Sequence, residues 1–131
     1  MKLEIKHLAP YLPYGLEVMY CPKEKGFNSP NSIANITKNG FGQDLLFGLQ
    51  EGFVKIFGLK PKTFLHELQD EIYIRWGGGI SKEAKGYWLK GFTDNLMYTA
   101  YPALKFDEIE FMAEYHIDIF GLINQGLAVA E

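Results

Sequence analysis

The sequence predicts a single α+β domain over residues 1–131, in which a small antiparallel sheet packs against two main helices. The first half contains short stretches in which apolar and polar residues alternate, as in half-buried strands. The second half contains two longer stretches whose apolar residues recur every three or four positions, as on one face of a helix. A chain of 131 residues has the usual size of one domain and can bury about two-thirds of its unfolded surface.

The chain begins with a short segment, residues 2–13, that prolines at positions 10 and 13 interrupt. Proline restricts the residue before it, so Ala9 and Leu12 are expected to be non-helical. The apolar residues before Ala9 fit one helical turn and a strand equally well, and both interpretations stay open.

Three strands are predicted next, at residues 15–21, 32–38 and 53–59. The second is expected to pair back on the first as a hairpin, across a loop that contains proline and glycine. Residues 39–52 are rich in glycine and predict a turn. A nucleotide site is disfavoured there, because the Gly-Phe-Gly at positions 40–42 is not followed by the Gly-Lys-Ser/Thr of a phosphate loop.

The first main helix is predicted over residues 61–76. Pro61 suits a first helical turn, and Thr63 is an alternative N-cap. The apolar face consists of Leu65, Leu68, Ile72 and Trp76. Three successive glycines, residues 77–79, are expected to end the helix as a hinge or a sharp turn.

Residues 80–105 mix basic and aromatic side chains. Ser81 is expected to cap a short helix that ends at Tyr87 or Trp88, and residues 96–100 predict a short strand. Lysines among aromatic rings can bind single-stranded nucleic acid by charge and stacking. The candidate residues for such a site are Lys82, Lys85, Tyr87, Trp88 and Lys90. The alternative is that lysine stems cover a core of rings, and no known nucleic-acid-binding spacing supports the first reading.

The second main helix is predicted over residues 107–121, within the stretch 106–127, which most clearly shows helical periodicity. Asp107 is the expected N-cap, and Gly121 and Gly126 are the two candidate stops. The apolar face consists of Ile109, Ala113, His116, Phe120, Ile123 and Leu127.

The other face of this helix is acidic. Glu110, Glu114 and Asp118 are spaced four residues apart, and no lysine or arginine follows residue 105. Such a row is either a solvated face or a ridge that binds a basic partner surface. His116 lies near these carboxylates in sequence, but residues two apart on a helix point to different sides. A hydrogen-bonded core histidine is therefore expected rather than a metal ligand or a catalytic group.

Composition and residue spacing argue against several classes of function. The net charge of −3 disfavours a sequence-independent nucleic-acid binder. A single cysteine, Cys21, fits a reducing cytoplasm, and neither a leader nor a membrane-length apolar run is found, so a soluble cytoplasmic protein is expected. The three histidines lie far apart, and neither zinc spacing nor an activated cysteine is evident. We expect no enzymatic activity, no metal and no cofactor.

Two terminal stretches suggest an origin. The opening IKHLAPYLPYGLEV and the ending AEYHIDIFGLINQGLA resemble small uncharacterised proteins of Bacteroidetes phages and prophages, which carry "LAPYLPYGL" and "EWHFDVFGLI…GLA" around a variable middle. The stretch LKPKTFLHELQDEI is similar to that family's central helix, whereas Tyr115 replaces its usual tryptophan and residues 77–101 have no counterpart. The resemblance implies a mobile-element protein that acts in host cytoplasm, and it supplies no activity.

The leading hypothesis is a non-catalytic interaction protein of phage origin that inhibits a host effector of nucleic-acid-targeting defence, as anti-CRISPR proteins do. It would use the acidic row of Glu110, Glu114 and Asp118 together with exposed aromatic residues. One alternative is a single-stranded nucleic-acid-binding accessory of phage replication or recombination, which would use the basic–aromatic residues between positions 82 and 90. Another alternative is a structural phage component. The expected partner is a host or phage protein, with no membrane involved.

Overall fold

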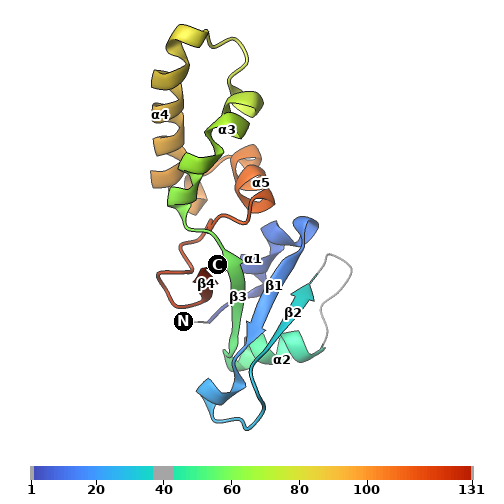
Figure 1. Cartoon of the computed structure of the whole chain (residues 1–131). Helices are drawn as coiled ribbons and strands as arrows, with labels where there is room; N and C mark the ends of the chain where they lie inside the picture. Colours follow the sequence, from blue (N-terminus) through green and yellow to red (C-terminus); the bar gives the residue numbers. More distant parts are fainter. Residues whose placement is uncertain (1, 37–42, 131) are drawn as a thin grey trace.

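The computed structural model describes residues 2–36 and 43–130 (Figure 1). In chain order the elements are α1 (Ile5–Leu8), the 3-10 helix η1 (Ala9–Tyr14), β1 (Leu16–Tyr20), the 3-10 helix η2 (Pro22–Lys25), β2 (Ser32–Ile36), α2 (Gln43–Glu51), β3 (Val54–Leu59), the 3-10 helix η3 (Lys62–Leu68), α3 (Gln69–Trp76), α4 (Lys82–Tyr98), the 3-10 helix η4 (Tyr101–Ala103), α5 (Phe106–Glu114) and β4 (Ala128–Ala130). The α+β class is confirmed.

The sheet has the order β2-β1-β3-β4. β1 pairs antiparallel with both β2 and β3, so the three predicted strands and the hairpin are confirmed, and residues 37 and 38 of the second prediction lie outside the described residues. β4 pairs parallel with β3, which makes the sheet mixed rather than wholly antiparallel. β4 lies at the end of the chain, just beyond the stretch predicted as the second main helix.

The helices are distributed differently from the prediction. α1 and α2 lie against one face of the sheet, whereas α3 and α4 form a helical hairpin that extends beyond its end (Figure 1). On the covered face Val18 and Ile56 are fully buried. The expectation that the helix of residues 61–76 covers the sheet is therefore wrong. That segment contributes Leu65 and Ile72 to the core from beyond the sheet.

The conformation expected before the two prolines is also wrong. Ala9 is right-handed helical, with φ −51° and ψ −45°, and it begins η1, which also includes Leu12. Pro10 occupies the first turn of this 3-10 helix, where its missing N–H needs no intrahelical partner. Of the two readings left open for the preceding residues, the helical turn is the one observed.

The glycine-rich stretch predicted as a turn contains α2, and its residues 39–42 lie outside the described part of the chain. Leu45 and Leu49 are buried, so α2 packs on the core. Gly48 is required by close packing, because a Cβ there would lie 2.4 Å from Cγ2 of Val54. A glycine that suggested a turn is thus a contact point between a helix and a strand.

The second half shows two further corrections. The helix predicted from Pro61 starts as the 3-10 helix η3 and becomes α-helical only at Gln69; neither Pro61 nor Thr63 caps it through a side chain. Ser81 caps α4 as predicted, by accepting a hydrogen bond from the Ala84 N–H, but α4 continues to Tyr98. The predicted strand over residues 96–100 is therefore wrong. Glycine at positions 86 and 91 weakens the helical signal, and packing of a buried face compensates for it.

Candidate interaction site

The long C-terminal helix of the prediction ends at Glu114, well before either candidate glycine. The stop is a Schellman motif, in which the His116 N–H donates to the Ala113 carbonyl and the Ile117 N–H donates to the Met112 carbonyl. His116 takes the left-handed position of this motif, with φ 55°. Glycine usually occupies that position, so the end of the helix could not be predicted from the local residue pattern.

Asp118 consequently does not lie on a helix with Glu110 and Glu114, and the predicted ridge of three carboxylates is wrong. The residue is buried, at 4% exposure. Its Oδ1 accepts a hydrogen bond from the Leu122 N–H at 2.8 Å, and its Oδ2 accepts one from the Ile123 N–H at 2.9 Å. Asp118 therefore holds the irregular segment after α5 and has no surface to offer a partner.

The first and the last parts of the described chain contact each other, through residues 11–15 and 116–119. The Tyr11 hydroxyl donates to the Ile117 carbonyl at 2.5 Å and accepts from the Ile119 N–H at 2.9 Å. Nε2 of His116 lies 2.7 Å from the Gly15 carbonyl, and its ring stacks at 6.5 Å from that of Tyr11. We call these five residues the clasp. The predicted hydrogen bond of His116 is confirmed. The residue is half-buried rather than in the core, and it follows the helix instead of lying within it.

Burial has a clear effect on the clasp tyrosine. Tyr11 is fully buried, and desolvation raises the pKa of its hydroxyl well above the usual value. The hydroxyl therefore stays protonated and keeps both hydrogen bonds throughout the physiological pH range.

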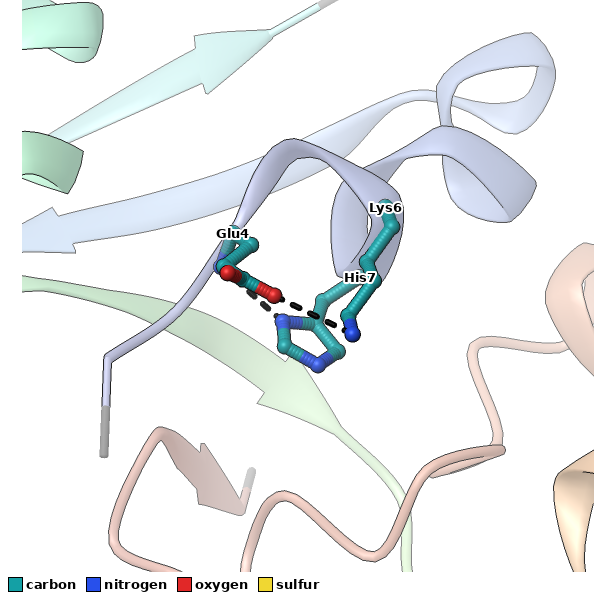
Figure 2. A network of polar contacts seen from close by, with 3 residues as sticks. All are labelled: Glu4, Lys6 and His7. Carbon is teal, nitrogen blue, oxygen red and sulfur yellow. Dashed lines mark hydrogen bonds and ion pairs between the residues drawn. The ribbon is translucent and has the colours of Figure 1, made fainter.

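His7 is a second structural histidine at the N-terminal side of the clasp. Its Nδ1 accepts a hydrogen bond from the Glu4 N–H at 2.9 Å, and Glu4 forms an ion pair with Lys6 at 3.2 Å (Figure 2). The buried ring packs edge-on against Phe120, with centroids 5.1 Å apart. Desolvation, and then the charge of Lys6, lower the pKa of His7, so this ring is neutral at neutral pH.

The exposed side of α5 retains an acidic character. At 100° per residue, Asp107, Glu110 and Glu114 share the outer side of the helix, and all three are exposed. Phe106, at the first helical position, is 80% exposed beside them. We call these four residues the acidic strip. It keeps two residues of the predicted ridge and adds Asp107 and Phe106, which the helical spacing could have indicated.

Asp107 does not act as the predicted N-cap. The N-cap is Lys105, whose N–H donates to Oε1 of Glu108 at 2.8 Å. Asp107 instead accepts a hydrogen bond from the indole N–H of Trp76 at 2.9 Å, which is the main reason that its pKa is lowered. This bond ties the start of α5 to the end of α3 and keeps the carboxylate charged.

Two other side chains border the acidic strip. Arg75 pairs with Glu114 at 3.0 Å, in an exposed contact of the kind worth at most about 1 kcal/mol. Tyr14 lies close enough for Glu110 and Glu114 to raise its pKa, after the larger effect of desolvation. Arg75 therefore offsets one of the three carboxylates, and the strip keeps a negative balance.

A cavity of about 440 Å³ opens next to the clasp. Tyr14, Gly15 and His116 line it from the clasp side. Glu17 and Phe57 line it from the face of the sheet that α1 and α2 leave open. Tyr14 thus lies between this cavity, which has both polar and apolar lining residues, and the acidic strip.

The basic–aromatic candidates all lie on α4, but they point in different directions. Lys82, Lys85, Tyr87, Trp88 and Lys90 are distributed around the helix at 100° per residue. The Trp88 ring stacks on Phe92 at 5.0 Å, and the Lys85 ammonium lies over the Tyr73 ring at 4.6 Å. Tyr87 is 90% exposed. The structure brings these residues to no common surface, and Trp88 packs within the hairpin.

The chain matches no family model, no curated protein and no solved structure. Within residues 2–36 and 43–130, no group of three or more histidine, cysteine or acidic side chains could hold a metal ion. In the same part of the chain, no helix combines the length and the apolar character needed to span a membrane. The features that define this protein are an α+β fold closed by the clasp and an acidic strip on α5.

Proposed function

We propose that this chain is a non-catalytic interaction protein of phage origin that binds a basic surface of a host protein through the acidic strip. The observation on which this proposal depends is the strip itself: three exposed carboxylates beside an aromatic ring that is 80% exposed. An acidic surface accelerates the encounter with a basic partner, and an exposed aromatic ring supplies apolar contact area in the resulting interface.

The class of partner follows from charge and from the resemblance of the terminal stretches. Effectors that target nucleic acid carry basic channels, and these complement the charge of the acidic strip. The phage resemblance adds that such an effector would belong to a host defence system, so that the protein acts as an inhibitor in the manner of anti-CRISPR proteins. The site of action would be the cytoplasm of a Bacteroidetes host.

The test is a pull-down of tagged protein from a Bacteroidetes host lysate, with and without nuclease treatment, followed by affinity measurement on the captured partner. The strip variant is Glu110→Lys/Glu114→Lys. The control is Glu51→Lys/Glu83→Lys, which makes the same change in net charge at exposed positions on α2 and α4. We expect the strip variant to bind at least about tenfold more weakly at low salt and the control to bind normally. Equal affinities of the two variants would refute the role of the strip.

Single-stranded nucleic-acid binding remains the second candidate, supported by the exposure of Tyr87 together with Lys82 and Lys90. It predicts salt-dependent binding to a single-stranded oligonucleotide. Tyr87→Ala is the better variant for this test, because Trp88→Ala would also remove packing within the hairpin. Partners lost on nuclease treatment would favour this candidate, and self-association without host partners would favour a structural phage component.

A further inference from the structure

Among the described residues, no strand lies beyond β2, so its outer backbone groups have no partner within the sheet. The Cys21 N–H donates to the Phe53 carbonyl, and the Ile56 N–H donates to the Leu127 carbonyl. Successive residues of a strand direct their backbone groups to opposite edges, so the odd-numbered residues of β1 bond to β3 and the even-numbered ones bond to β2. The β2 partners of those even-numbered residues are Ser32, Ala34 and Ile36.

Ile33 and Asn35 must therefore direct their N–H and C=O groups away from β1. Within the described part of the chain no strand pairs with that edge. Both residues are exposed, and Ile33 is 52% exposed in spite of its apolar side chain. Two donors and two acceptors in strand geometry are complementary to the backbone of another extended segment.

A second feature lies beside the same edge. A cavity of about 490 Å³ opens there, a volume typical of pockets that enclose a small ligand. Its apolar wall includes Phe27, Phe47 and Phe53, whose rings contact one another edge-on at 5.4 to 6.0 Å. Phe27 is 39% exposed and Phe47 is 47% exposed, so the cavity is an open apolar surface.

The cavity and the edge share residues. Ser32 and Ala34 line the cavity, and they lie on the face of β2 opposite to the side chains of Ile33 and Asn35. A strand added to the edge would place alternate side chains on that same face. One of them would then lie at the mouth of the cavity.

We propose that β2 and this cavity form a binding site for an extended peptide segment of a partner protein, which adds to the sheet as a fifth strand and inserts a large apolar side chain into the cavity. This is recognition by strand addition, in which backbone hydrogen bonds supply affinity and a pocket for alternate side chains supplies specificity. The site is separate from the acidic strip, and the proposal does not depend on it.

A second copy of the chain is a poorer occupant. If two β2 strands paired with each other, the side chains facing the cavity would come from Ser32, Ala34 and Ile36 of the other copy. The first two are small, and Ile36 is already buried in its own core at 6% exposure. None of them can fill an aromatic cavity, whereas a peptide with a leucine, phenylalanine or similar residue can.

The test begins with selection from a phage-displayed library of random ten-residue peptides on the full-length protein. The most enriched sequence is then synthesised with a fluorescent label and titrated by polarisation. We expect enriched peptides to share one large apolar residue. We also expect binding to slow hydrogen exchange at the amides of Ile33 and Asn35, which point outward in the free protein.

Two variants and one control separate the two parts of the site. Ile33→Pro removes an outward N–H without removing a bond to β1, a substitution that edge strands tolerate. Ser32→Phe fills the cavity. Asn35→Thr keeps the outward N–H in a residue that favours strands and serves as the matched control. We expect at least about a tenfold loss of affinity in each of the first two variants and no more than a twofold change in the control.

Several results would overturn the proposal. One is a library selection that enriches no sequence. Another is a peptide that binds Ile33→Pro and Ser32→Phe as tightly as the unchanged protein, or that leaves the two amides unprotected. A dimer in light scattering that Ile33→Pro converts to a monomer would assign the edge to a second copy instead. Circular dichroism of each variant shows that the fold is retained.

Discussion

The substitution Tyr11→Phe tests the clasp, because it removes one oxygen atom and leaves the ring in place. That oxygen makes two hydrogen bonds, with the Ile117 carbonyl at 2.5 Å and with the Ile119 N–H at 2.9 Å. The Tyr11 side chain is fully buried, so water cannot replace either bond without a rearrangement. Each buried backbone group left unpaired costs about 1–3 kcal/mol, and the two together should cost about 2–6 kcal/mol.

A loss of that size would be a large fraction of the stability of a typical domain, which is about 5–15 kcal/mol. We expect equilibrium unfolding in urea to show a lower midpoint with an unchanged slope, since the surface exposed on unfolding stays the same. The matched control is Tyr87→Phe. Tyr87 is 90% exposed, so the same chemical change there should alter stability by no more than about 0.5 kcal/mol.

Hydrogen exchange makes the test specific to the clasp. The Ile119 amide should exchange faster in Tyr11→Phe than in the unchanged protein, because its acceptor is gone. The reasoning would be refuted if Tyr11→Phe destabilised the protein no more than Tyr87→Phe does. It would also be refuted if the Ile119 amide kept its protection, since another group would then hold that N–H.

Three further outcomes follow from buried polar side chains. Asp118→Ala leaves two backbone N–H groups without acceptors and should cost about 2–6 kcal/mol in urea unfolding. Asp70→Ala, at an exposed position, should cost less than about 0.5 kcal/mol. In the folded state the pKa of His7 is lowered from 6.5, so the unfolded chain binds more protons than the folded one as pH falls below 6.5. The free energy of unfolding should therefore decrease at such pH. His7→Gln should remove this pH dependence, and the control His66→Gln should keep it. Thr93→Val should raise the unfolding midpoint by an amount worth about 1 kcal/mol, because the buried Thr93 hydroxyl has no partner among the described residues.

The sequence predicted those elements whose local signals agree with their packing. β1 alternates buried and exposed residues from Leu16 to Val18, and β3 is rich in β-branched and aromatic residues, so both strands were found. α2 was missed because Gly48 looks like a turn residue in sequence, although its role is to let the helix approach Val54. The reason for that glycine is a contact with a different element, which no local pattern contains.

The acidic residues of the candidate site were also predicted only in part, because a contact with a distant segment decides where the helix ends. The acidic row was predicted by continuing a helical period through residue 118, but the Schellman motif at His116 breaks the period between Glu114 and Asp118. A left-handed histidine is uncommon, because the Cβ atom disfavours that conformation. Here the surroundings compensate, since the His116 ring bonds to the Gly15 carbonyl and stacks on Tyr11, both of which are about a hundred residues away in the chain.

The clasp and the helical hairpin together fix the orientation of the acidic strip. The clasp holds the end of α5, because it engages His116 and Ile117 directly after the helix. The hairpin holds the start, because the Trp76 ring packs against Phe111 with centroids 5.0 Å apart and its N–H bonds to Asp107. A hairpin of different length could extend from the same frame without moving the strip, provided that this tryptophan contact is kept. The length of the hairpin can thus vary without a change in the geometry of the carboxylates on α5.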